Sequence, residues 1–146
     1  MKTSSDHELR TSRLLKASPD EIFRAFRESE RLARWWGPKG FQNTFHEFEF
    51  KPGGTWRYDM HGPDGADYPN KSVFQQVSPA RIVIRHLEPM HAFTLTMTLT
   101  KETGGTWLDW VMAFDSAEEC DKVRPFVPRC NEENLDRLES ELARIP

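Results

Sequence analysis

Apolar and polar residues alternate through much of the middle of the chain, and a period of two is typical of strands that bury one face. The alternation is clearest over residues 93–100, where every second residue is a threonine. Residues 108–114 repeat the pattern after the turn signal Gly104-Gly105. These two segments predict an antiparallel hairpin whose inner face carries Phe93, Leu95, Met97 and Leu99 on one strand and Leu108, Trp110, Met112 and Phe114 on the other.

Five further segments favour strands, and Pro or Gly residues separate most of them. They predict strands over residues 8–16, 44–50, 55–60, 71–77 and 81–87. In three of these segments the alternation also assigns the inner face. The predicted inner face carries His46, Phe48 and Phe50 in segment 44–50, Trp56, Tyr58 and Met60 in segment 55–60, and Ile82, Ile84 and His86 in segment 81–87.

Three short segments carry helix signals. Ser18 is a predicted N-cap, because Pro19 follows at the first helical position and the acidic residues after it favour the positive end of the helix dipole. A second short helix is predicted over residues 29–36, and Ser116 is predicted to cap a third. Pro125 and Pro128 are expected to interrupt that third helix before the last one begins.

Residues 129–145 predict the longest helix. Its apolar residues lie three or four apart and form one stripe, made of Leu135, Leu138, Leu142 and Ile145. Its charged residues are expected on solvated faces: Glu132, Glu133, Asp136, Arg137, Glu139 and Glu141. Traced backward by one turn, the stripe reaches Asn131, with Asn134 beside it. Either the Asn131 amide is buried and meets water, backbone or a ligand, or it borders solvent near Pro128.

The order of elements is one strand, two helical segments, about six strands and helices at the end, which predicts an α+β domain. Sequential strands with short turns form an antiparallel meander, and a twisted meander curves around the helix that covers it. No internal repeat or linker divides the sequence. We therefore expect residues 1–146 to form a single domain, with residues 1–7 as a flexible terminus.

Charge and composition narrow the range of partners. The chain has a formal net charge of -3 and no cluster of Lys or Arg, so we expect no nucleic-acid partner and no anionic membrane surface. No apolar run is long enough for membrane insertion, and residues 1–8 lack the apolar stretch of a signal peptide, so the expected location is cytoplasmic. Cys120 and Cys130 do not have the spacing of a zinc motif, and we expect neither a metal site nor a cofactor.

Six short motifs follow one another in an order that resembles a known family. They are Ser18-Pro19-Asp20-Glu21-Ile22-Phe23, Trp35-Trp36-Gly37-Pro38, Pro52-Gly53-Gly54-Thr55-Trp56, Pro63-Asp64-Gly65, Pro79-Ala80-Arg81-Ile82-Val83 and Gly104-Gly105-Thr106. Together they resemble the family of proteins homologous to the activator of the 90-kilodalton heat-shock-protein ATPase, within the START-like (SRPBCC) superfamily. The resemblance extends from about residue 9 to residue 144.

The resemblance implies a helix-grip fold, in which a curved antiparallel sheet wraps around the long C-terminal helix and leaves an internal cavity. It implies less about function, because the superfamily includes lipid carriers, hormone receptors, polyketide cyclases and oxygenase subunits. One departure concerns the cavity wall. Members often carry a Gly-Trp pair before the last helical turns, where this chain has Arg129-Cys130-Asn131-Glu132.

The large residues on the predicted inner faces are candidates for a ligand-binding pocket, because flat rings and flexible thioethers suit an apolar ligand. Periodicity alone favours a filled core, since any sheet needs an apolar face, whereas the resemblance favours a cavity. The candidate residues are Trp35, Trp36, Trp56, Tyr58, Met60, His86, Phe93, Met97, Trp110, Met112 and Asn131.

Two groups among these candidates have alternative roles. Trp35 and Trp36 end a helical segment just before Gly37-Pro38, where they could gate the pocket. Adjacent helical residues point about 100° apart, so the alternative is one buried ring and one ring on the surface. His46 and His86 are expected on inner faces, where an imidazole can bond a ligand, act as a general base or belong to the core.

The sequence therefore supports binding of a small hydrophobic or amphipathic molecule and does not identify that molecule. One alternative is an enzyme of the cyclase or dehydratase kind in the same cavity, with His86 or His46 as proton shuttle and Asn131 or Tyr58 as polar anchor. No nucleophile motif or carboxylate pair marks catalytic residues. A chaperone-regulating interaction domain is a third alternative, and a homodimer is a further one for which no interface can be named.

Overall fold

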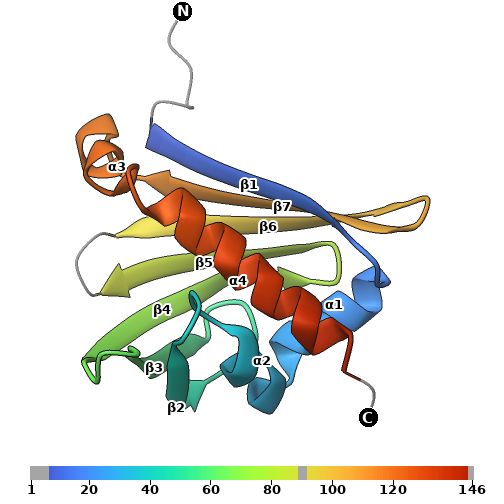
Figure 1. Ribbon diagram of the computed structural model, residues 1–146, viewed down its shortest axis with the longest axis horizontal. Coiled ribbons are helices and arrows are strands. Elements are labelled where there is room, and N and C mark those ends of the chain that lie inside the picture. Colours follow the sequence, from blue (N-terminus) through green and yellow to red (C-terminus); the bar gives the residue numbers. More distant parts are fainter. Residues whose placement is uncertain (1–6, 89–91, 145–146) are drawn as a thin grey trace, which may run out of the picture.

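The computed structural model describes residues 7–88 and 92–144. Its strands are β1 (Glu8–Leu15), β2 (Gln42–Phe48), β3 (Thr55–His61), β4 (Asp67–Ser78), β5 (Arg81–Glu88), β6 (Phe93–Glu102) and β7 (Gly105–Phe114). Its helices are α1 (Pro19–Arg27), α2 (Ser29–Trp35), α3 (Ala117–Val123) and α4 (Val127–Leu142). Within these residues the strands form one curved antiparallel sheet, and α4 crosses one face of it diagonally (Figure 1). This arrangement confirms the predicted α+β helix-grip fold.

The sheet is a meander from β2 to β7, because each of these strands pairs with the next one in the chain. Strand β1 completes the order β1-β7-β6-β5-β4-β3-β2 by pairing with β7. In the β6–β7 hairpin Leu95 lies opposite Met112 and Met97 lies opposite Trp110. Opposed residues share a face of the sheet, so both strands turn their apolar positions toward α4, as their alternation predicts.

Helix α1 begins at the predicted N-cap. The Ser18 hydroxyl oxygen accepts a 3.2 Å hydrogen bond from the Glu21 backbone N–H, and the Glu21 carboxylate accepts a 3.0 Å bond from the Ser18 backbone N–H. This reciprocal capping box satisfies two N–H groups that the first turn leaves unpaired. Helix α3 starts in a similar way, since the Ser116 hydroxyl oxygen accepts a 3.1 Å bond from the Glu119 N–H.

The inner face of β2 differs from the prediction, because a β-bulge lies between Phe45 and Glu47. Phe45 points inward, with its ring centroid 5.5 Å from that of Trp56. His46 is instead exposed, and its Nε2 lies 3.0 Å from an Asp59 carboxylate oxygen. The prediction that His46 lies on an inner face is wrong, since one extra residue reverses the alternation of a strand.

Helix α4 starts two residues earlier than predicted, at Val127. Pro128 lies in its first turn, where the missing N–H breaks no helical hydrogen bond, so it does not interrupt the helix. In the predicted stripe Leu135 and Leu138 are fully buried and Leu142 is half-buried. Ile145, the last residue of that stripe, lies outside the described residues.

Two charged residues of α4 do not lie on solvated faces as expected. Glu141 is only 4% exposed, and it accepts hydrogen bonds of 2.8 and 3.0 Å from Arg34 and Arg31 of α2. Arg137 is half-buried and donates to the backbone carbonyl oxygens of residues 34 and 36–38. Both residues therefore fasten α4 to the end of α2 and the connection that follows it.

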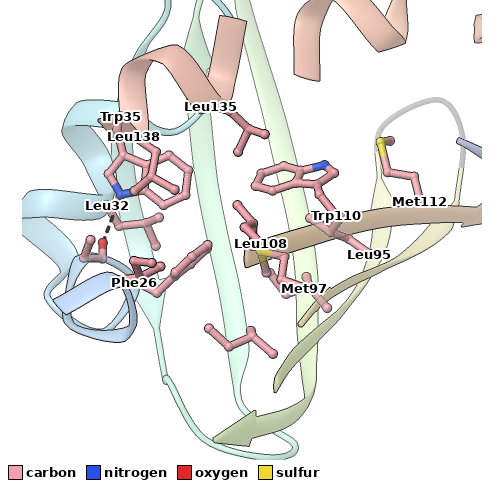
Figure 2. Packing of buried hydrophobic residues seen from close by; sticks show 14 of the residues in the cluster. Phe26, Leu32, Trp35, Leu95, Met97, Leu108, Trp110, Met112, Leu135 and Leu138 are labelled. Atoms are coloured by element: carbon pink, nitrogen blue, oxygen red, sulfur yellow. Dashed lines mark hydrogen bonds between the residues drawn. The ribbon is translucent and has the colours of Figure 1, made fainter. Parts of the chain in front are cut away.

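The core beneath the C-terminal half of α4 is filled. Leu135 and Leu138 pack there with Phe26, Leu32 and Trp35 from the two N-terminal helices (Figure 2). The Phe26 and Trp35 rings meet edge to face with centroids 4.8 Å apart, and the Trp35 indole N–H donates a 3.0 Å hydrogen bond to the Ala25 carbonyl oxygen. This cluster anchors the helix and leaves its N-terminal half to cover the rest of the sheet.

Candidate functional site

A cavity of about 330 Å³ lies between the sheet and the N-terminal half of α4. Strands β3 to β7 supply one wall through their inner-face residues. The Trp36–Pro38 segment after α2 and the connection between α3 and α4 supply the sides. The two halves of α4 therefore have different roles, because one covers a filled core and the other covers a cavity.

Eight of the eleven candidate residues line this cavity. Six reach it because alternate positions of a strand share one face of the sheet. They are Tyr58, Met60, His86, Phe93, Trp110 and Met112. Trp36 and Asn131 line the cavity from the helical side.

The other three candidates, Trp35, Trp56 and Met97, belong to the filled core and are at most 1% exposed. Trp35 points into the cluster with Phe26, whereas Trp36 lines the cavity, because successive residues at a helix end point in different directions. Trp56 stacks on Tyr58 with ring centroids 4.3 Å apart and so packs directly beside a residue of the cavity wall. The two alternative interpretations of the inner-face residues, pocket lining and filled core, thus each describe part of the same apolar face.

Trp36 and Tyr58 form a hydrogen-bonded pair in the wall. The Trp36 indole N–H donates to the Tyr58 hydroxyl oxygen at 3.2 Å, and Ser72 is a second hydrogen-bonding neighbour of that hydroxyl. Burial raises the pKa of Tyr58 well above its usual range, and the hydrogen bonds with Trp36 and Ser72 oppose this effect only in part. The phenol is therefore protonated and uncharged at neutral pH.

His86 and Asn70 form a second polar pair. The Asn70 side-chain N–H donates to the Tyr68 carbonyl oxygen at 2.7 Å, so the Asn70 Oδ1 faces His86 and accepts from its Nε2 at 2.9 Å. The His86 residue is 9% exposed, and its ring stacks on Phe93 with centroids 4.7 Å apart. These contacts hold the imidazole in one orientation along the wall.

Asn131 and Asn134 are both buried, at 6% and 4% exposure, but their amides differ in hydrogen bonding. The Asn134 Oδ1 accepts a 2.7 Å bond from the Gly37 backbone N–H. The Asn131 Nδ2 meets only the Met112 sulfur, a weak acceptor, at 3.4 Å. Its Oδ1 has no hydrogen-bond partner among the described residues. Asn131 is thus a largely buried amide that lines the cavity.

The cavity wall contains the imidazole of His86 but, among the described residues, no acidic side chain and no lysine or arginine. Burial raises the pKa of the half-buried Cys130 thiol, and the nearby Glu133 carboxylate raises it further, so this thiol stays neutral as well. Together with the protonated Tyr58, these groups form an apolar surface with a few neutral polar atoms, which is typical of sites for small apolar molecules.

The sequence pattern of one protein family matches residues 16–143, which is most of the chain. That family is described as Activator of Hsp90 ATPase homolog 1-like protein. The chain belongs to this family. The match confirms the resemblance drawn from the six motifs, and the fold of this family member is the START-like fold that the resemblance implied.

Solved structures of similar fold cover nearly all of this family member. A solution structure of a protein from Arthrobacter aurescens has a TM-score of 0.88 and 21% identity, over 98% of this chain and 90% of that one. A crystal structure of a protein from Rhodobacter sphaeroides has a TM-score of 0.86 and 24% identity, over 97% and 95% of the two chains. An AHSA1-like protein from Aeromonas hydrophila has a TM-score of 0.75 and 15% identity, over 95% and 97%. A comparison with curated proteins found no match.

Phe126 and Tyr68 mark the mouth of the cavity in this family member. Both line the cavity, and both are exposed large apolar residues, at 46% and 38%. Phe126 lies in the connection between α3 and α4, and Tyr68 lies near the start of β4. The cavity therefore opens to solvent beside these two residues.

Sequence reasoning missed the cavity residues of β4, which are Tyr68, Asn70 and Ser72. The strand begins at Asp67, four residues before its predicted start. Steps of two backward from the buried Phe74 lead to all three residues on the inner face, so the signal was present in the sequence. Pro69 concealed it, because proline is uncommon within strands.

Among the described residues, no helix is long and apolar enough to cross a membrane. No three His, Cys, Asp or Glu side chains in that part of the chain gather as metal ligands do. His91, one of the histidines of the sequence, lies outside the described residues.

Proposed function

We propose that this protein binds a small apolar or amphipathic molecule in the cavity beneath the N-terminal half of α4. The cavity itself carries the proposal, because its volume of about 330 Å³ and its apolar wall with a few polar groups are typical of ligand sites. An engineered apolar cavity of about 150 Å³ binds benzene. A cavity about twice as large suits a molecule of two fused aromatic rings or similar size.

Empty space of this size is unfavourable for stability, because the side chains around it lose contacts that a filled core would make. The same chain fills the other half of the interface with large residues such as Trp35 and Leu135. Several positions that line the cavity carry small or polar side chains where larger apolar ones would close it, and Ser72, Cys130 and Asn131 are among them. This contrast between the two halves supports a binding role for the cavity.

Catalysis of the cyclase or dehydratase kind in the same cavity is the second candidate function. The observation that favours it is the fixed orientation of His86 by Asn70, because an oriented imidazole can transfer a proton. In that case His86→Ala would abolish turnover of a bound molecule while Tyr58 and Trp36 still formed the wall. Binding by the wild type without turnover favours the first candidate. The cavity adds no support to a chaperone-regulating interaction.

Native mass spectrometry of freshly purified protein, combined with thermal unfolding in the presence of neutral two-ring molecules, tests the proposal. We expect a co-purified mass or a higher Tm, because a molecule that binds only the folded state stabilises it. Leu95 lines the cavity and is 2% exposed, so Leu95→Trp should fill the space and abolish both signals. Leu95→Met nearly conserves the volume and should keep them. A wild type with neither signal contradicts the proposal.

A further inference from the structure

Most polar groups of the cavity wall are already engaged with one another. The Trp36 indole N–H donates to the Tyr58 hydroxyl oxygen, and the His86 Nε2 is hydrogen-bonded to the Asn70 Oδ1. The Gly37 backbone N–H donates to the Asn134 Oδ1. The Trp110 indole nitrogen has no hydrogen-bond partner in the described part of the chain, but protein atoms enclose it and keep it from contact with a molecule in the cavity. Among the described residues this leaves Asn131 as the side-chain amide of the wall that has no oxygen or nitrogen partner.

Asn131 occupies a position where the apolar stripe of α4 predicts a leucine. It lies four residues before Leu135 and seven before Leu138, so all three share one face of the helix. The two leucines are fully buried, and Asn131 is 6% exposed. A buried amide destabilises the fold unless it forms hydrogen bonds. Within residues 7–88 and 92–144, the Asn131 amide forms only the weak contact with the Met112 sulfur. The missing partner is therefore expected from the contents of the cavity.

We propose that the ligand is an uncharged molecule whose apolar body fills the cavity and whose single hydroxyl group hydrogen-bonds to Asn131. This inference rests on the proposed function and specifies the class of molecule. A hydroxyl group can donate to the Asn131 Oδ1 and accept from its Nδ2, so one group satisfies both ends of the amide. The largely apolar wall leaves the remainder of the molecule in apolar contact.

The same wall disfavours an anionic ligand. A carboxylate that enters the cavity loses its hydration and needs a cation or several hydrogen-bond donors in return. Within the described part of the chain, no Lys or Arg side chain lines the cavity. A pure hydrocarbon is disfavoured for a different reason, because it leaves the Asn131 amide without a partner.

Isothermal titration with three probes of one ring system, naphthalene, 2-naphthol and 2-naphthoate, tests the inference at about pH 7.5, where an ordinary imidazole is mostly uncharged. We expect 2-naphthol to bind about tenfold more tightly than naphthalene, and 2-naphthoate to bind most weakly. Equal affinities of 2-naphthol and naphthalene, or a higher affinity of 2-naphthoate, would overturn the inference and leave the proposed function intact. If none of the three probes binds, the proposed function itself fails for molecules of this size.

The variant Asn131→Leu tests whether Asn131 causes the preference for 2-naphthol over naphthalene. Leucine extends the apolar stripe, so the variant should fold, and thermal unfolding verifies that it does. We expect its affinity for 2-naphthol to fall about tenfold while naphthalene binds at least as well as before. Asn131→Ala should lose the same preference, and Met97→Leu, a change in the filled core, should keep it. Full preference for 2-naphthol in both Asn131 variants would overturn the role of Asn131.

Discussion

The side-chain oxygen of Asn134 accepts a 2.7 Å hydrogen bond from the backbone N–H of Gly37. Asn134 lies in the middle of α4, and Gly37 lies in the connection that follows α2. The bond holds this connection against the helix and so fixes the side wall of the cavity next to Trp36. Arg137, three residues further along α4, reinforces the attachment by donating to the carbonyl oxygens of Trp36, Gly37 and Pro38, each at 3.0 Å.

Replacing Asn134 by Ala should lower the free energy of unfolding by about 1–3 kcal/mol, because it leaves the buried Gly37 N–H without its acceptor. Urea unfolding of the purified variant measures the change. Ser140→Ala is a matched control on an exposed position of the same helix, and we expect it to change the free energy of unfolding by less than about 0.5 kcal/mol. Similar losses in the two variants would show that the Asn134 contact does not matter.

Gly37→Ala should also destabilise the fold, by about 1–3 kcal/mol, chiefly through its backbone conformation. Gly37 has a φ of +97°, which residues with a Cβ rarely adopt, and an added Cβ would lie 2.6 Å from the flexible end of the Met60 side chain and 3.3 Å from the Phe41 Cβ. Gly53 has a similar φ of +82° but no neighbouring atom within 4 Å of its added Cβ. Gly53→Ala should therefore cost only about 1 kcal/mol. Equal losses in urea unfolding would show that crowding of the added Cβ at Gly37 contributes nothing beyond the backbone strain.

Glu141 should make the stability of the protein depend on pH in the acid range. Burial by itself raises the pKa of this carboxyl group, but the hydrogen bonds and charges of Arg34, Arg31 and Arg144 outweigh burial and lower the pKa to about 2. A group whose pKa is lower in the folded state stabilises that state when ionised. The contribution is therefore fully present above the ordinary pKa of 4.5 and is lost as the pH falls toward 2.

The variant Glu141→Gln isolates this contribution. At neutral pH it should be less stable than the wild type by about 2 kcal/mol, an estimate reduced because solvent partly screens the arginine partners. At about pH 3 the difference should shrink, since the wild type loses part of the same contribution. Glu139→Gln removes a more exposed partner of Arg13 and should cost less than about 1 kcal/mol. A difference between wild type and Glu141→Gln that is equal at both pH values would contradict this account.

Local sequence signals were sufficient to predict most helices and strands of the fold. The threonine alternation of β6 and the Ser18 capping signal each depend on neighbours in the chain, so they predicted the hairpin and the start of α1. The bulge in β2 has no such signal, and it placed His46 on the outer face. Glu141 is buried because arginines of α2 reach it across 107 and 110 residues, a tertiary relationship that the helical period does not contain.

The candidate site could be predicted only in part from the sequence, because its extent also depends on tertiary packing. Alternation assigned Tyr58, Trp110 and Met112 to the correct face, but it could not separate the part of that face which lines a cavity from the part which packs in the core. Trp56 and Met97 lie on that face and are core residues. The boundary depends on where the leucines of α4 give way to Asn131, because the side chains of the helix decide how much of the sheet is filled.

The indole N–H signals of the five tryptophans give the most direct test of the central claim, that a small molecule binds in this cavity. Trp36 and Trp110 line the cavity, whereas Trp107 is 40% exposed, lies outside the cavity and alternates with the buried Leu108 on β7. In a nitrogen–proton NMR titration with 2-naphthol, we expect saturable shifts of the Trp36 and Trp110 indole signals and an unchanged Trp107 signal. Unchanged Trp36 and Trp110 signals, or a shift confined to Trp107, would contradict the claim.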